Sequence, residues 1–95
     1  MLDKNVVEDA IFMFQTRWYG KCDTTVPGNE EQDSVVQQTI DDLLFFLDML
    51  PDGAPVDYRD LDDRGVFILD EFVDPELRAP IQRLKKELMD AAVSD

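Results

Sequence analysis

The sequence contains no histidine and only one cysteine among its 95 residues. Histidine commonly activates catalytic nucleophiles and binds metals, so its absence removes the usual partner for a reactive Cys22. Lys21 is the only cationic neighbour of Cys22, and a single cysteine cannot form an internal disulfide. Paired carboxylates such as Asp41 and Asp42 point about 100° apart on a helix and do not converge on one substrate atom. We therefore predict a protein that is not an enzyme, with no catalytic residue, no metal site and no cofactor.

Long apolar runs are also missing. No stretch approaches the roughly 18 consecutive apolar residues that a membrane span requires. The first ten residues, MLDKNVVEDA, lack the basic start and the uninterrupted apolar segment of a secretory signal. These absences predict a soluble cytoplasmic protein with no membrane partner.

The chain is short as well, and this limits its core. Its 95 residues are enough for one domain, spanning 1–95. A domain of this size buries only about 60 to 65% of its extended-chain surface, which leaves a small margin of stability. The length is therefore consistent with either a monomer or a homodimer.

Basic residues are scarce. Nine lysines and arginines face 22 acidic residues, for a net charge of −13. This exceeds the roughly 2 to 8 charges that a small domain needs for solubility. Residues 23–76 hold sixteen of the acids and only two basic residues, whereas both ends of the chain are close to neutral. Such a chain repels nucleic acid and anionic membranes, so we expect no direct binding to nucleic acid and a basic protein surface as partner.

The stretch from Asn29 to Leu50 carries the clearest helical pattern. Its apolar residues recur at helical spacing; they are Val36, Ile40, Leu43, Leu44, Leu47 and Leu50. Asn29 is expected to cap this helix with Gln32 at the capping-box position, and Pro51 is expected to end it.

Two further helices are predicted on either side. Residues 1–19 place Val7, Ile11, Phe14 and Trp18 on one face, with Asp3 as cap and Gly20 as stop. A last helix begins at Asp74 and Pro75, and Pro80 either kinks it or restarts it. The apolar stripe of that helix is Leu77, Ile81, Leu84, Leu88 and Ala92. The fold class is therefore mainly α, a small bundle of three principal helices.

The segment between the second and third helices is harder to assign. The two prolines of Pro51 to Asp63 predict an acidic loop with little regular structure. The four apolar residues Val66 to Leu69 fit either a short strand, or hairpin, or one turn of helix, and periodicity does not choose between them. A strand there would make the fold α+β and would need a partner, for which Pro55 to Tyr58 is a weak candidate.

The same segment partly matches a calcium-binding loop. Asp60, Asp62, Gly65 and Glu71 fall at positions one, three, six and twelve of that motif. Arg64 occupies the fifth position, where an oxygen ligand is required. We interpret the match as an acidic segment that resembles the motif by chance.

The central helix and the following loop carry the candidate binding residues. Sixteen of the 22 acids are aspartate, although glutamate is the better helix former, and short stiff carboxylates resemble a phosphate ladder. Phe45 projects opposite the apolar stripe and should pack against a third element or a partner. The predicted partner-binding residues are Asp41, Asp42, Asp48, Asp52, Asp57, Asp60, Asp62, Asp63 and Phe45.

In charge and length the chain resembles small phage DNA mimics, anti-CRISPR inhibitors and nuclease immunity proteins. No sequence motif carries this resemblance. It implies a non-enzymatic inhibitor whose carboxylates occupy a basic site on a nucleic-acid-binding protein or nuclease complex. The alternative is a helical subunit or adaptor that docks into a larger assembly through an apolar surface formed by Phe45, Tyr58 and the stripe from Leu77 to Leu88.

Overall fold

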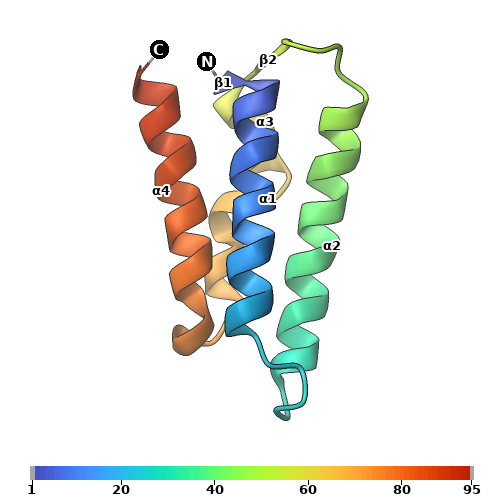
Figure 1. Ribbon diagram of the computed structural model, residues 1–95, viewed down its shortest axis with the longest axis vertical. Coiled ribbons are helices and arrows are strands. Elements are labelled where there is room, and N and C mark those ends of the chain that lie inside the picture. The colour runs from blue at the N-terminus through green and yellow to red at the C-terminus, as the bar shows by residue number, and fades with distance from the viewer. Residues whose placement is uncertain (1, 95) are drawn as a thin grey trace.

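The computed structural model describes residues 2 to 94, with the side chains of Tyr58, Val93 and Ser94 left outside the description. Three long helices lie side by side: α1 (Lys4–Lys21), α2 (Asn29–Asp48) and α4 (Arg78–Ser94). Figure 1 shows α1 in the middle of this layer and antiparallel to both neighbours. The prediction of a mainly α fold with three principal helices is confirmed.

Short elements lie behind the layer in Figure 1 and across its upper end. They are β1 (Leu2–Asp3), β2 (Pro55–Val56), the α-helix α3 (Tyr58–Asp63) and the 3-10 helices η1 (Val66–Glu71) and η2 (Pro75–Leu77). The two strands pair antiparallel, with Leu2 opposite Val56 and Asp3 opposite Pro55. This pairing fastens the start of the chain to the segment that follows α2.

Helix α1 begins where the sequence predicts. The carboxylate of Asp3 accepts a hydrogen bond from the backbone N–H of Asn5 at 2.8 Å, which satisfies one of the free donors of the first turn. The predicted stop at Gly20 is wrong, because the helix continues to Lys21 and Cys22 is its C-cap. The backbone N–H of Cys22 still donates to the Trp18 carbonyl at 2.7 Å, so Gly20 keeps a helical conformation.

Helix α2 begins differently from the prediction. Gly28 is the N-cap residue and has φ of 92°, a conformation that glycine adopts at low cost. The Asn29 side chain donates instead to the carbonyl of Asp23 at 3.0 Å. Gln32 accepts from the backbone N–H of Asp74 at 3.2 Å, a contact with the segment before α4. The predicted Asn29 cap and capping box are therefore wrong, because the Asn29 side chain contacts the preceding loop and the Gln32 side chain contacts the segment before α4.

The carboxyl end of α2 is stabilised by a residue from α1. The helix ends at Asp48, two residues before the predicted Leu50, and its last turn contains no basic residue. Lys4 is only 6% exposed, and its ammonium group donates to the carbonyl of Leu50 at 2.8 Å. A positive charge at this end of a helix is favourable because the helix dipole is negative there.

Removal of the Lys4 ammonium group is a first test of this fold. Lys4→Met keeps the apolar stem but leaves the Leu50 carbonyl without its donor, and we expect a loss of about 1 to 2 kcal/mol in the free energy of unfolding. Urea unfolding followed by far-UV circular dichroism measures it. Lys86→Met is the matched control, because Lys86 is exposed on α4. Equal stability of the two variants would contradict the proposed role of Lys4.

The segment from Pro51 to Asp63 is more regular than predicted. Only its first part is a loop, because β2 begins at Pro55 and α3 begins at Tyr58. Asp57 caps α3 by accepting from the backbone N–H of Arg59 at 2.9 Å, and Leu61 is fully buried. One cap and one buried anchor are enough for this short helix.

The apolar run from Val66 to Leu69 forms neither a strand nor a hairpin. It lies in η1, where residues three apart share a face because a 3-10 helix has three residues per turn. Val66 and Leu69 are accordingly both buried. In α4, Pro80 falls in the first turn, where no intrahelical N–H is needed, so it accompanies a restart after η2.

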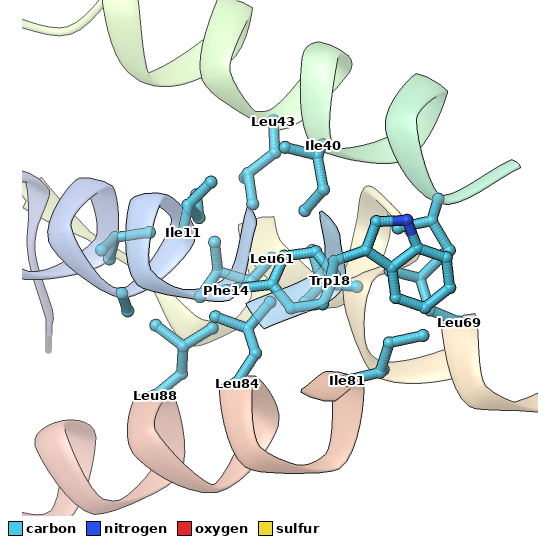
Figure 2. Packing of buried hydrophobic residues seen from close by; sticks show 14 of the residues in the cluster. Ile11, Phe14, Trp18, Ile40, Leu43, Leu61, Leu69, Ile81, Leu84 and Leu88 are labelled. Carbon is cyan, nitrogen blue, oxygen red and sulfur yellow. The ribbon is translucent and has the colours of Figure 1, made fainter. Parts of the chain in front are cut away.

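The core lies between the three long helices (Figure 2). Ile11, Phe14 and Trp18 of α1 meet side chains from α2 and α4, and each is fully buried. The Phe14 and Trp18 rings lie 6.0 Å apart between centroids. Facing them are Ile40 and Leu43 of α2, Leu61, Leu69, and Ile81, Leu84 and Leu88 of α4. None of the helices within residues 2 to 94 combines the length and apolarity needed to cross a lipid bilayer.

Candidate protein-binding surface

The solvent side of α2 combines apolar and acidic residues. We call it the α2 outer face; it comprises Asp41, Asp42, Phe45, Asp48 and Met49. Phe45 is 70% exposed and Met49 is 71% exposed, although both are large apolar side chains. Phe45 is therefore not packed inside the described part of the chain, and its predicted contact with a partner stays a prediction.

The carboxylates around Phe45 have no cationic partner. Among the described residues, no lysine or arginine lies within 4 Å of Asp41, Asp42 or Asp48. Asp41 and Asp48 are two helical turns apart, or about 10 Å along the axis. Phosphates along one DNA strand are spaced about 3.4 Å along its axis. The α2 outer face therefore presents separate charges and not a phosphate ladder.

The other five predicted carboxylates lie elsewhere. Asp52 is in the loop after α2, 3.8 Å from the Lys4 ammonium group, and Asp57 caps α3. Asp60 is half-buried, whereas Asp62 and Asp63 are exposed on α3. In Figure 1, α3 lies behind the layer and α2 forms its right-hand edge. The predicted residues thus divide between α2 and the α3 region.

A cation lies beside the α2 outer face. The guanidinium carbon of Arg64, the residue after α3, is 4.0 Å from the centroid of the Phe46 ring, a cation–π contact. Arg64, Phe46 and Leu50 line a hollow of about 400 Å³ together with Phe45 and Met49. Arg64 therefore borders the acidic face on the flank where α3 ends.

A second hollow of about 390 Å³ lies on the opposite flank of Phe45. Its walls are Glu8 and Phe12 of α1 and Leu44, Phe45 and Asp48 of α2. Phe12 is 55% exposed and was not among the predicted site residues. Its signal in the sequence is an aromatic residue that falls outside the buried stripe of its helix.

Several of the basic side chains are paired on the far side of the layer. Arg17 of α1 and Arg83 of α4 both contact Glu87, at 3.0 and 3.4 Å. Lys85 lies 3.0 Å from Asp70. Arg17, Arg83 and Lys85 are thus neutralised within the chain, while no described lysine or arginine pairs with the carboxylates of the α2 outer face.

Cys22 lies apart from both hollows. Burial raises the pKa of its thiol, and the negative charges of Asp33 and Asp23 raise it further. The hydroxyl and backbone N–H of Thr25 donate to Asp23 and lower the pKa of that exposed carboxyl. A raised thiol pKa disfavours the nucleophilic thiolate, which agrees with the prediction of an unreactive cysteine.

The segment that matches a calcium-binding loop does not form such a loop in the structure. The segment that matches a calcium loop, Asp60 to Glu71, is folded as parts of α3 and η1. Within residues 2 to 94 no three acidic, histidine or cysteine side chains are grouped as a metal site.

The stripe from Leu77 to Leu88 is buried in the core, so it is not available for docking into an assembly. That alternative also named Phe45, which is exposed, and Tyr58, whose side chain is outside the described part.

No protein-family model matches this sequence. No curated protein and no solved structure matches it either.

Proposed function

We propose that this protein is a non-enzymatic binding protein, acting in the cytoplasm, whose α2 outer face occupies a basic surface of another protein. The observation that carries the proposal is Phe45, an exposed aromatic side chain in the last turn of α2. Around it lie the carboxylates of Asp41, Asp42 and Asp48, which pair with no lysine or arginine among the described residues. A buried aromatic anchor with a charged rim is the common arrangement of a binding hot spot.

The charge distribution supports a cationic partner. Carboxylates that have no cation of their own gain most from lysine and arginine side chains on another molecule. The exposed Asp62 and Asp63 on α3 add to the negative field and raise the rate of encounter from a distance. Basic surfaces of this kind are typical of nucleic-acid-binding proteins and nuclease complexes.

Occupation of such a surface would block the binding of nucleic acid to the partner by competition. This is the manner in which DNA mimics, anti-CRISPR inhibitors and nuclease immunity proteins are expected to act. The wide spacing of the carboxylates on α2 favours contact with individual lysines and arginines over imitation of a regular phosphate backbone.

The proposal predicts steep salt dependence. A partner retained by the immobilised full chain should elute in a salt gradient, and its affinity should fall at least tenfold between 50 and 500 mM NaCl, because screening shortens the range of charge interactions. Calorimetry or surface plasmon resonance at both salt concentrations measures this. An affinity that stays constant over this range would refute the electrostatic account.

The exposed apolar residues favour one alternative. Phe12, Phe45 and Met49 would also suit a helical subunit that docks into a larger assembly, with its acidity serving solubility. Such docking would be insensitive to salt or strengthened by it. The same pair of measurements therefore separates the two functions.

A further inference from the structure

We infer that the groove between α1 and α2 binds a cationic amphipathic helix of the partner. We call it the α1–α2 groove; its lining is Glu8, Phe12, Leu44, Phe45 and Asp48. The inference rests on the proposed function and names the partner's shape and chemistry at that site.

The walls of the α1–α2 groove are apolar and accessible. Phe12 of α1 is 55% exposed and Phe45 of α2 is 70% exposed, and both line the hollow together with the half-buried Leu44. A single exposed apolar residue is ordinary, whereas exposed apolar residues that lie together mark interaction sites. Two such residues on one hollow are suited to apolar anchors from a partner.

The position of the groove suits a helix. α1 and α2 are long antiparallel neighbours in the layer of α1, α2 and α4 (Figure 1). α3 and η1 lie behind this layer. A groove between two such helices can accept the ridge of a third helix at an interaxial distance of about 8 to 10 Å. Helix-in-groove recognition uses anchors spaced three or four residues apart. The occupant would then lie on the face of the layer, over the groove between α1 and α2.

The rim of the groove determines the charge of the occupant. Glu8 and Asp48 both belong to the lining, and no lysine or arginine among the described residues does. The ammonium group of Lys4 lies 3.8 Å from the Glu8 carboxylate, whereas no described lysine or arginine lies within 4 Å of Asp48. Asp41 lies two turns before Asp48 on the same side of α2. Lysine or arginine next to the apolar anchors of the occupant would pair with Asp48 and Asp41.

The same charges argue against a second copy of this chain. In a symmetric dimer centred on Phe45, each of Asp41, Asp42 and Asp48 would lie near the same residues of the other copy. Both copies also carry a net charge of −13. Like charges that face each other across an interface cost affinity, so a basic heterologous helix fits where a homodimer does not.

A pair of synthetic peptides tests the inference on the full chain. The first peptide is an 18-residue helix with leucines on one face and lysines elsewhere; the second has the same composition in an order that gives no apolar face. We expect the first to bind at least tenfold more tightly. In NMR spectra of the ¹⁵N-labelled chain, its largest amide shifts should fall on the residues of the α1–α2 groove.

Matched variants locate the binding. The double variant Phe12→Ser and Phe45→Ser should lower the affinity for the amphipathic peptide at least tenfold. Phe45→Ser alone should lower this affinity by a smaller factor. Phe72→Ser, at a position that is 57% exposed beyond η1, is the control and should leave the affinity unchanged. Circular dichroism of each variant shows whether it is folded.

The outcomes separate this inference from the proposed function. Three results would overturn the inference that the α1–α2 groove binds an amphipathic helix. They are equal affinity for both peptides, amide shifts that fall outside the groove, and no binding of either peptide. Each of these results leaves the salt dependence of the natural partner as the independent test of the acidic surface. Concentration-dependent dimerisation that is lost in Phe45→Ser would also overturn the inference, because a second copy would then occupy the groove.

Discussion

Replacement of Trp18 by alanine is expected to cost about 4 kcal/mol in the free energy of unfolding. We expect the largest loss of any alanine substitution here, because Trp18 is the largest fully buried side chain among the described residues. Trp18 is fully buried, and its ring lies 6.0 Å from that of Phe14 between centroids. Removal of a buried tryptophan typically costs about 3 to 5 kcal/mol, because apolar contacts are lost and a cavity remains. A domain of this length has a total stability of about 5 to 14 kcal/mol. The variant should therefore be poorly folded at 37 °C.

A polar contact adds to this effect. The indole N–H of Trp18 donates to the carboxylate of Asp33 at 2.7 Å, which joins α1 to the first half of α2. Trp18→Phe should fill most of the space but leave Asp33 without its main donor, so we expect an intermediate loss of about 1 to 3 kcal/mol.

Urea unfolding by far-UV circular dichroism measures these losses, since the variants lack the only tryptophan as a fluorescence probe. Tyr19→Ala is the control, because Tyr19 is the adjacent aromatic residue and is 66% exposed. A similar stability of Trp18→Ala and Tyr19→Ala would show that Trp18 does not lie in the core.

Trp18 also illustrates which parts of the fold can be predicted from sequence. Its place in the core follows from the step of four residues after Phe14, and the long helices follow from the same periodicity. Such a stripe extends over about three to four turns, so local irregularities do not hide it. The contact with Asp33 was not predicted, because it depends on how α1 and α2 are rotated against each other.

The short elements depend on distant partners, and sequence patterns describe them poorly. β2 exists because it pairs with β1, more than fifty residues earlier in the chain. Gln32 was predicted to cap its own helix but contacts Asp74, a residue of the segment before α4. In each case a tertiary contact competes with a local one, and local spacing alone cannot show which prevails.

The candidate surface could be predicted only in part. The helical period places Phe45 and the aspartates around it on one solvent face. The period does not show that α3 lies behind the layer, so the aspartates of α2 and α3 seemed to form one tract. Phe12 was missed because its contact with the groove requires knowledge of which helix packs beside α2.

Charge reversal on the α2 outer face has the largest expected effect on binding. Asp41→Lys, Asp42→Lys and Asp48→Lys together should lower the affinity for the basic partner at least a hundredfold, since three attractive contacts become repulsive. All three residues are exposed and unpaired, so the far-UV circular dichroism and the urea midpoint should change little. Titration of the purified partner by calorimetry measures the affinity.

A second triple variant with the same change of charge tests the location of the contact. Asp62→Lys, Asp63→Lys and Glu71→Lys alter exposed residues of α3 and η1 that are not part of the α2 outer face. Loss of long-range attraction alone should slow association by less than tenfold and leave the dissociation rate unchanged, because rim and distant charges act mainly on the rate of encounter. Reversal on α2 should instead raise the dissociation rate. If both variants lost affinity equally through the association rate, net charge and not the α2 outer face would determine binding, and Phe45 would have no part in it.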